Sequence, residues 1–149
     1  MNPYLRFAAM IFTSTVVMFG LMYLNLYVLD HMFFSETRLY MALIMGASMA
    51  LVMLGFMRGM YASRALNALI GVLAVAVFAG SLWLVRSQAS VDQVSWLKAM
   101  IPHHSIAILT SERAHIEDPR VRQLADEIIA AQRREIDEMK ALISELESR

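Results

Sequence analysis

Residues 39–57 read LYMALIMGASMALVMLGFM, and this run decides the fold class. It contains 19 residues without a single charge. At about 1.5 Å per residue, one α-helix of this length crosses a hydrocarbon core of about 30 Å. Two more charge-free runs, residues 7–29 and 65–85, have 23 and 21 residues. The sequence therefore predicts three transmembrane helices, with the lipid bilayer as their surroundings.

The composition agrees with a membrane protein. Of the 149 residues, 58% are hydrophobic and 17% are charged, which is too apolar for a soluble domain of this size. The net charge is zero and basic side chains are not concentrated in a patch, so we expect no nucleic-acid partner. Because the chain has no cysteine, metal ligands must come from His, Met, Asp or Glu.

The short loops predict an orientation, because Lys and Arg near the ends of spans favour the cytoplasmic side. Arg58 and Arg64 lie in the tight loop between the second and third runs, on the same side as Arg6. We expect a bacterial inner-membrane protein with a cytoplasmic N-terminus and a periplasmic, or otherwise extracytoplasmic, C-terminal part. Residues 1–86 form the predicted transmembrane region and residues 87–149 the second domain.

Methionine recurs at every fourth position of the second run, at Met41, Met45, Met49, Met53 and Met57. This spacing places the side chains along one ridge of a helix. Two interpretations are open. Methionine is a flexible packing residue in apolar segments, whereas a ladder of thioethers suits a soft ion such as Cu(I). Copper transport along the ridge is therefore one alternative function.

The rest of the chain contains two helix-start signals. Ser90 fits the beginning of a capping box, and Asp118 followed by Pro119 fits the N-cap and first position of another helix. We expect helices over residues 90–115 and 119–147, joined by a very short turn and therefore antiparallel. The predicted fold is all-α, with three transmembrane helices followed by an antiparallel α-helical hairpin.

Apolar residues at alternating spacings of three and four predict the seam between these two helices. The seam passes through His104 on the first helix and Glu135 on the second. With the turn near residue 117, Met100 lies opposite Glu135, His103 is at the same level, and Met139 is one turn away. Thioether, imidazole and carboxylate groups on facing helices can ligate a metal from both sides. The predicted seam consists of Val94, Leu97, Ile101, His104, Ile108, Ser111 and His115, then Val121, Leu124, Ile128, Ala131, Glu135, Met139, Leu142 and Leu146.

A structural interpretation of the same residues is equally open. In it, Glu135 pairs with Arg133, Arg134 or a neighbouring chain, and the histidines only form hydrogen bonds. Glu112 and His115 form one Glu-x-x-His motif. A di-iron centre needs two such motifs and two further Glu, so we do not expect a ferroxidase or another enzyme.

Two segments resemble a known family. Met-Ile-Pro-His-His at residues 100–104 and Ile-x-x-x-Gln-x-x-Glu-Ile-x-x-Met at residues 128–139 are similar to the family called domain of unknown function 305, over about residues 91–143. The resemblance implies a ferritin-like helical domain, here a half bundle, and periplasmic copper binding through Met and His. By position it implies a copper site formed by Met100, His103, His104 and Met139, with Gln132 and Glu135 in supporting roles.

This chain departs from the family pattern at two places. Leu109 replaces a methionine that usually follows the His pair, and Ser105-Ile106 replaces a more common Gln-Gly.

The sequence thus predicts a membrane-anchored metal-binding protein that captures or buffers an ion, copper by the resemblance, on its extracytoplasmic hairpin. Because two helices cannot bury a full core alone, we expect the hairpin to form a homo-oligomer or to pack on the end of the third span. The alternative is a structural membrane protein whose hairpin mediates oligomerisation without metal.

Overall fold

The structure is a computed structural model that describes residues 2–148. The all-α prediction is confirmed, because these residues form five α-helices and two short 3-10 helices, with no strand among them. The helices are α1 (Pro3–Leu21), α2 (Glu36–Phe56), α3 (Arg64–Ser87), α4 (Gln93–Arg113) and α5 (Pro119–Glu147), and the 3-10 helices are Leu29–His31 and Arg58–Met60. The chain divides into two compact units. Unit 1 comprises Met1–Met22 and Thr37–Ser90, and unit 2 comprises Tyr23–Glu36 and Val91–Arg149.

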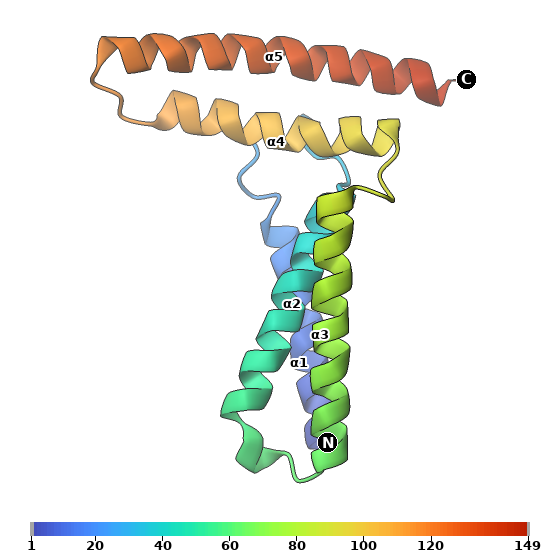
Figure 1. Ribbon diagram of the computed structural model, residues 1–149. Coiled ribbons are helices and arrows are strands. Elements are labelled where there is room, and N and C mark those ends of the chain that lie inside the picture. The colour runs from blue at the N-terminus through green and yellow to red at the C-terminus, as the bar shows by residue number, and fades with distance from the viewer. Residues whose placement is uncertain (1, 149) are drawn as a thin grey trace. The chain divides into compact units, whose positions relative to one another are not determined.

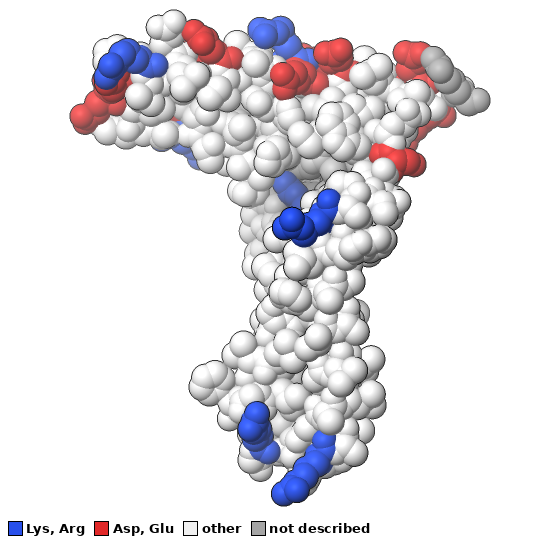
Figure 2. All heavy atoms as spheres, viewed as in Figure 1, with Lys and Arg blue, Asp and Glu red and all other residues white. Residues whose placement is uncertain are grey.

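In unit 1, α1, α2 and α3 lie side by side (Figure 1). All three are long and apolar enough to cross a membrane, judged by length and composition. On the face drawn in Figure 2, charged side chains are found only near the ends of this unit. Small residues of α2 are buried against the neighbouring helices, namely Ala42, Gly46, Ala47 and Ala50. Close helix contact at small residues is typical of membrane-spanning helices.

The first helix is shorter than its charge-free run. The run continues to Leu29, but α1 ends at Leu21. The segment Tyr23–Glu36, which we call the docking loop, belongs instead to unit 2. Its Tyr27, near the end of the run, and Phe33, beyond it, pack against the core of that unit. Leu24 and Leu29 are 77% and 80% exposed, so Tyr27 is the part of the run's end that serves protein packing.

In unit 2, α4 and α5 lie next to each other and run in opposite directions (Figure 1). The predicted start of the second helix is confirmed, since the Asp118 side chain caps α5 by accepting from the Arg120 N–H at 2.8 Å and Pro119 is the first helical residue. The predicted capping box at Ser90 is wrong. Asp92 caps α4, accepting from the Ser95 N–H at 2.7 Å, and a carboxylate is as good a cap as a hydroxyl.

The core of unit 2 is one hydrophobic cluster from α4 and α5, consisting of Leu97, Ile101, Ile108, Ile136, Met139 and Ile143. The docking loop adds Tyr27 and Phe33 to it. α4 continues as a helix through Pro102, which is itself buried. Two helices and one loop therefore form this core together.

The predicted seam is correct on α4 at Leu97, Ile101 and Ile108. On α5 it is correct at Met139, which is buried, and at Leu146, which packs against the core cluster, but elsewhere it is displaced by about one residue. The buried residues of α5 are Ala125, Ile136, Met139 and Ile143, whereas Val121, Leu124, Ile128 and Leu142 remain exposed. Glu135 is not in the seam, because 51% of its side chain is accessible. A physical reason is that α5 carries two adjoining apolar stripes, and the rotation observed buries the one without a carboxylate, which is costly to desolvate.

Replacing Gly46 by Ala is predicted to destabilise unit 1. A Cβ at this position would lie 2.2 Å from Thr15 Oγ1, and overpacking of this kind costs about 1–3 kcal/mol. Gly71→Ala is the matched control, since a Cβ there meets nothing within 4 Å. Thermal unfolding of both variants in detergent micelles checks this. Equal melting temperatures for Gly46→Ala and Gly71→Ala would contradict the close approach of α1 and α2.

Candidate metal-binding site

His104 lies between two acceptors on the edge of α4. Its Nδ1 is 3.0 Å from the carbonyl oxygen of Met100, one helical turn back. Its Nε2 is 2.7 Å from a carboxylate oxygen of Glu135 on α5. A carbonyl oxygen only accepts, so Nδ1 carries a proton and donates to it. Nε2 is then the ring nitrogen that faces the carboxylate.

The His104–Glu135 pair is only partly shielded from water. The accessible fraction is 12% for the His104 side chain and 51% for that of Glu135. The structure also shows which partner Glu135 has, a point that the sequence left open: Glu135 contacts His104 rather than Arg133. Arg133 instead pairs with Glu112 at 2.6 Å.

The other predicted site residues lie around this pair to different degrees. His103 is exposed, and its ring centroid is 6.2 Å from that of His104. Met100 is half-buried and packs against the core cluster, and Met139 is a member of that cluster. Gln132 lies one turn before Glu135, and its Oε1 is buried and makes no hydrogen bond to the residues that the structure describes. An unsatisfied buried carbonyl oxygen is uncommon and needs a partner.

Within the described part of the chain, no group of three His, Cys, Asp or Glu side chains is gathered tightly enough to hold a metal. The structure brings together one histidine and one carboxylate, with the amide oxygen of Gln132 on the same helix as the carboxylate. The members of the Glu-x-x-His motif pair with different residues. Glu112 binds Arg133, and His115 is exposed and lies 3.2 Å from Glu117.

The docking loop is held to α4 by a buried hydroxyl that the sequence did not single out as a contact. Ser105 Oγ, on a fully buried residue, accepts the Tyr27 N–H at 2.8 Å. The same hydroxyl lies 2.9 Å from Nδ1 of His31. Ser105 is one of the positions where the chain departs from the family pattern. No spacing rule connects it to residues more than 70 positions earlier, so sequence reasoning had no signal for this contact.

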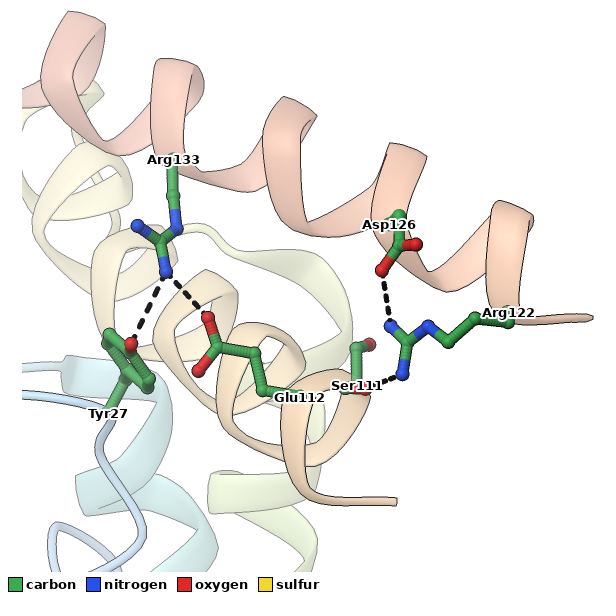
Figure 3. Close-up of polar contacts among 6 residues, drawn as sticks. All are labelled: Tyr27, Ser111, Glu112, Arg122, Asp126 and Arg133. Carbon is green, nitrogen blue, oxygen red and sulfur yellow. Dashed lines mark hydrogen bonds and ion pairs between the residues drawn. The ribbon is translucent and has the colours of Figure 1, made fainter. Parts of the chain in front are cut away.

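A second polar network joins α4, α5 and the docking loop, and Figure 3 shows it in close-up. The Arg133 guanidinium donates to Glu112 and, at 3.3 Å, to the Tyr27 hydroxyl, and it lies 5.5 Å from the Tyr27 ring centroid. About three turns earlier on α5, Arg122 binds Asp126 at 2.7 Å and the Ser111 carbonyl at 3.1 Å (Figure 3). These two arginines are neutralised by carboxylates, so the network fixes the packing of the three segments.

The fold and site together define an all-α protein with three candidate membrane-spanning helices and a two-helix unit that carries a histidine–carboxylate pair. Residues 50–147 match the family described as Domain of unknown function (DUF305). This is more than half of the chain, so the protein belongs to the DUF305 family. The match begins well before residue 91, where the resemblance seen in the sequence began.

One relative is the Uncharacterized protein L153 of Acanthamoeba polyphaga mimivirus, which is 43% identical over 65 residues. The match covers 42% of this chain and 43% of that protein. No solved structure matches the chain.

Acidification is predicted to weaken the attachment of the docking loop. Burial lowers the pKa of His31 below its ordinary value of 6.5, Lys140 lowers it further, and Asp30 and Asp137 oppose this. Unfolded His31 therefore binds a proton more readily than His31 in folded unit 2. The contribution of His31 to the stability of unit 2 is fully present above about pH 6.5 and is lost as the pH falls below it. The measurement is hydrogen exchange of the Tyr27 amide, relative to its intrinsic rate.

His31→Gln is the control, because a neutral side chain should make the protection of Tyr27 independent of pH in this range. Equal pH dependence in the wild type and His31→Gln would show that His31 is not the titrating group.

Proposed function

We propose that this DUF305 protein is a membrane-anchored metal-binding protein that captures or buffers an ion, copper in the first instance, on α4 and α5. In this proposal α1, α2 and α3 anchor the chain in a bacterial inner membrane, and α4 and α5 form a ferritin-like half bundle on the extracytoplasmic side. Arg6, Arg58 and Arg64 support a cytoplasmic N-terminus through the bias of basic residues toward the cytoplasm.

The observation that carries the proposal is the orientation of His104. Histidine ligands usually donate their second ring N–H to a backbone carbonyl or carboxylate, which fixes the tautomer and directs the other nitrogen at the metal. His104 makes such a bond through Nδ1 to Met100 and directs Nε2 at Glu135. A metal ion bound at Nε2 would leave the Nδ1 bond intact.

The surrounding donors fit an ion at this position. Gln132 offers a buried amide oxygen that lacks a hydrogen-bond partner among the described residues. His103 is exposed and adjacent, so its ring can join after a rotamer change, which is fast for exposed side chains. Imidazole and carboxylate suit Cu(II) and Zn(II), and copper binds a given site of this type more tightly. Copper is therefore the first metal to test and zinc the reference.

Full-length protein in detergent is predicted to bind copper through His104. His104→Ala should lower the affinity by at least about tenfold, the lower end of what even an indirect ligand contact contributes. His115→Ala is the matched control, since His115 is exposed and contacts Glu117 away from this pair. Isothermal titration calorimetry with copper measures both.

No copper binding by the wild-type protein, or equal affinity in the two variants, would refute the proposal. A structural protein without metal instead predicts that His104→Ala changes the assembly state while chelators have no effect.

Copper transport is a second candidate, supported by a cavity in unit 1. The cavity has a volume of about 350 Å³ and is lined by Met10, Met57 and Met60, together with Arg6 and Tyr61. Met57 is the last residue of the methionine ridge, which begins at the exposed Met41. Thioethers suit Cu(I), while the positive charge of Arg6 disfavours a tightly held cation in this cavity.

Replacing Met45, Met49 and Met53 together by Leu is predicted to abolish Cu(I) uptake into proteoliposomes if the ridge conducts the ion. The swap nearly conserves volume and should cost less than about 1.5 kcal/mol per site, so folding is retained. Met32→Leu is the control, since Met32 is an exposed methionine outside α2 and outside the ridge. Uptake that is unchanged in the triple variant, or absent in the wild type, would assign the ridge to packing.

A further inference from the structure

α5 carries an exposed apolar stripe in addition to the face that packs on α4. Val121, Leu124, Ile128 and Leu142 are 50%, 56%, 36% and 39% accessible. Their spacings of three, four and fourteen residues place them on one side of the helix, with Ala131 and Glu135 between them. Large aliphatic side chains aligned in this way are typical of a helix that packs against another helix.

The charge along α5 selects the kind of surface that fits this stripe. Residues 119–134 carry four Arg against Asp126 and Glu127, a net charge of +2, and residues 135–148 carry Lys140 against five carboxylates, a net charge of −4. Ion pairs with Glu112 and Asp118 neutralise the first half. In the second half Lys98 pairs with Glu147 and Asp30 pairs with Lys140, so this half stays acidic. Helices that lie on bilayers instead carry basic residues beside their apolar face. An anionic lipid surface therefore does not suit this stripe.

The chain itself supplies a complementary surface. A second α5 aligned in parallel would place two acidic halves together, which is unfavourable, but an antiparallel α5 places each acidic half beside the neutral or basic half. We propose that the exposed stripe is the interface with a second copy of this chain, with the two α5 helices antiparallel.

Pairing Leu124 with Leu142 gives a register for this pair. When Leu124 faces Leu142 of the second copy, the two-fold axis passes beside Arg133, and Glu135 faces Ala131 of the second copy. The second copy thereby covers one side of the His104–Glu135 pair. The interface is carried by the apolar stripe and the charge pattern and does not require a bound metal, so it stands or fails independently of the proposed function.

The absence of cysteine from the chain allows a direct test by cross-linking. We would prepare full-length Leu124→Cys, Leu142→Cys and the double variant in detergent and treat each with a short bismaleimide. Positions 124 and 142 are 18 residues apart, about 27 Å along one helix, so they cannot be linked within one chain. The antiparallel register predicts a covalent dimer from the double variant and little or none from either single variant.

The matched control is Gln123→Cys with Ala141→Cys. These exposed positions have the same separation but lie on another side of α5, and we expect at least tenfold less dimer from them. Linking by both single variants would show a parallel pair and overturn the proposal. Equal linking in the control would also overturn the proposal. No linking in any variant would overturn it too, and would mean that a different partner protein or the bilayer covers the stripe. Light scattering on the wild-type protein should give the mass of two chains, and a monomeric mass would also overturn it.

Discussion

The contact between the docking loop and α4 closes a core that two helices alone leave open. Ser105 is fully buried and holds the Tyr27 backbone, while Tyr27 and Phe33 cover the cluster built on Ile101 and Ile108. A buried hydroxyl with partners is stabilising, and the same group without them costs about 1–3 kcal/mol. Unit 2 is therefore assembled from two segments separated in sequence by the whole of α2 and α3.

The contact with the docking loop also determines which side chains of α4 remain accessible. Successive residues of an α-helix are rotated by about 100°. Ser105 faces the docking loop, Ile101 and Ile108 face α5, and His104 falls at the far edge of the face that contacts α5. There it is shielded enough to be oriented by Met100 and Glu135, yet it remains in reach of water. This combination of orientation and access to water is what the proposed ion binding requires of His104.

Much of the fold followed from local rules. The charge-free runs located α2 and α3 within a few residues, and the Asp118-Pro119 signal located the start of α5. The end of α1 could not be predicted, because hydropathy does not distinguish apolar residues that face lipid from those that pack on another part of the protein. The rotation of α5 was mispredicted for a similar reason, since two adjoining apolar stripes fit a helical period equally well.

For the candidate site too, spacing predicted some features and could not predict others. Spacing placed His104 and Glu135 on the same level, and the structure brings them within 2.7 Å. Spacing could not predict that Met100 contributes its backbone to His104, that Met139 enters the core, or that Gln132 retains a buried oxygen without a partner among the described residues. These features depend on side-chain directions across two helices and on the loop, which a one-dimensional pattern does not contain.

The most direct test is ¹⁵N NMR of the histidine side chains during titration of full-length protein with Zn(II), which is diamagnetic and suits the same imidazole and carboxylate donors as Cu(II). A metal site at His104 predicts that its Nε2 resonance shifts with metal occupancy while Nδ1 remains protonated and bonded to the Met100 carbonyl. A His104 spectrum that does not change at saturating Zn(II) would contradict the assignment of this pair as a metal site.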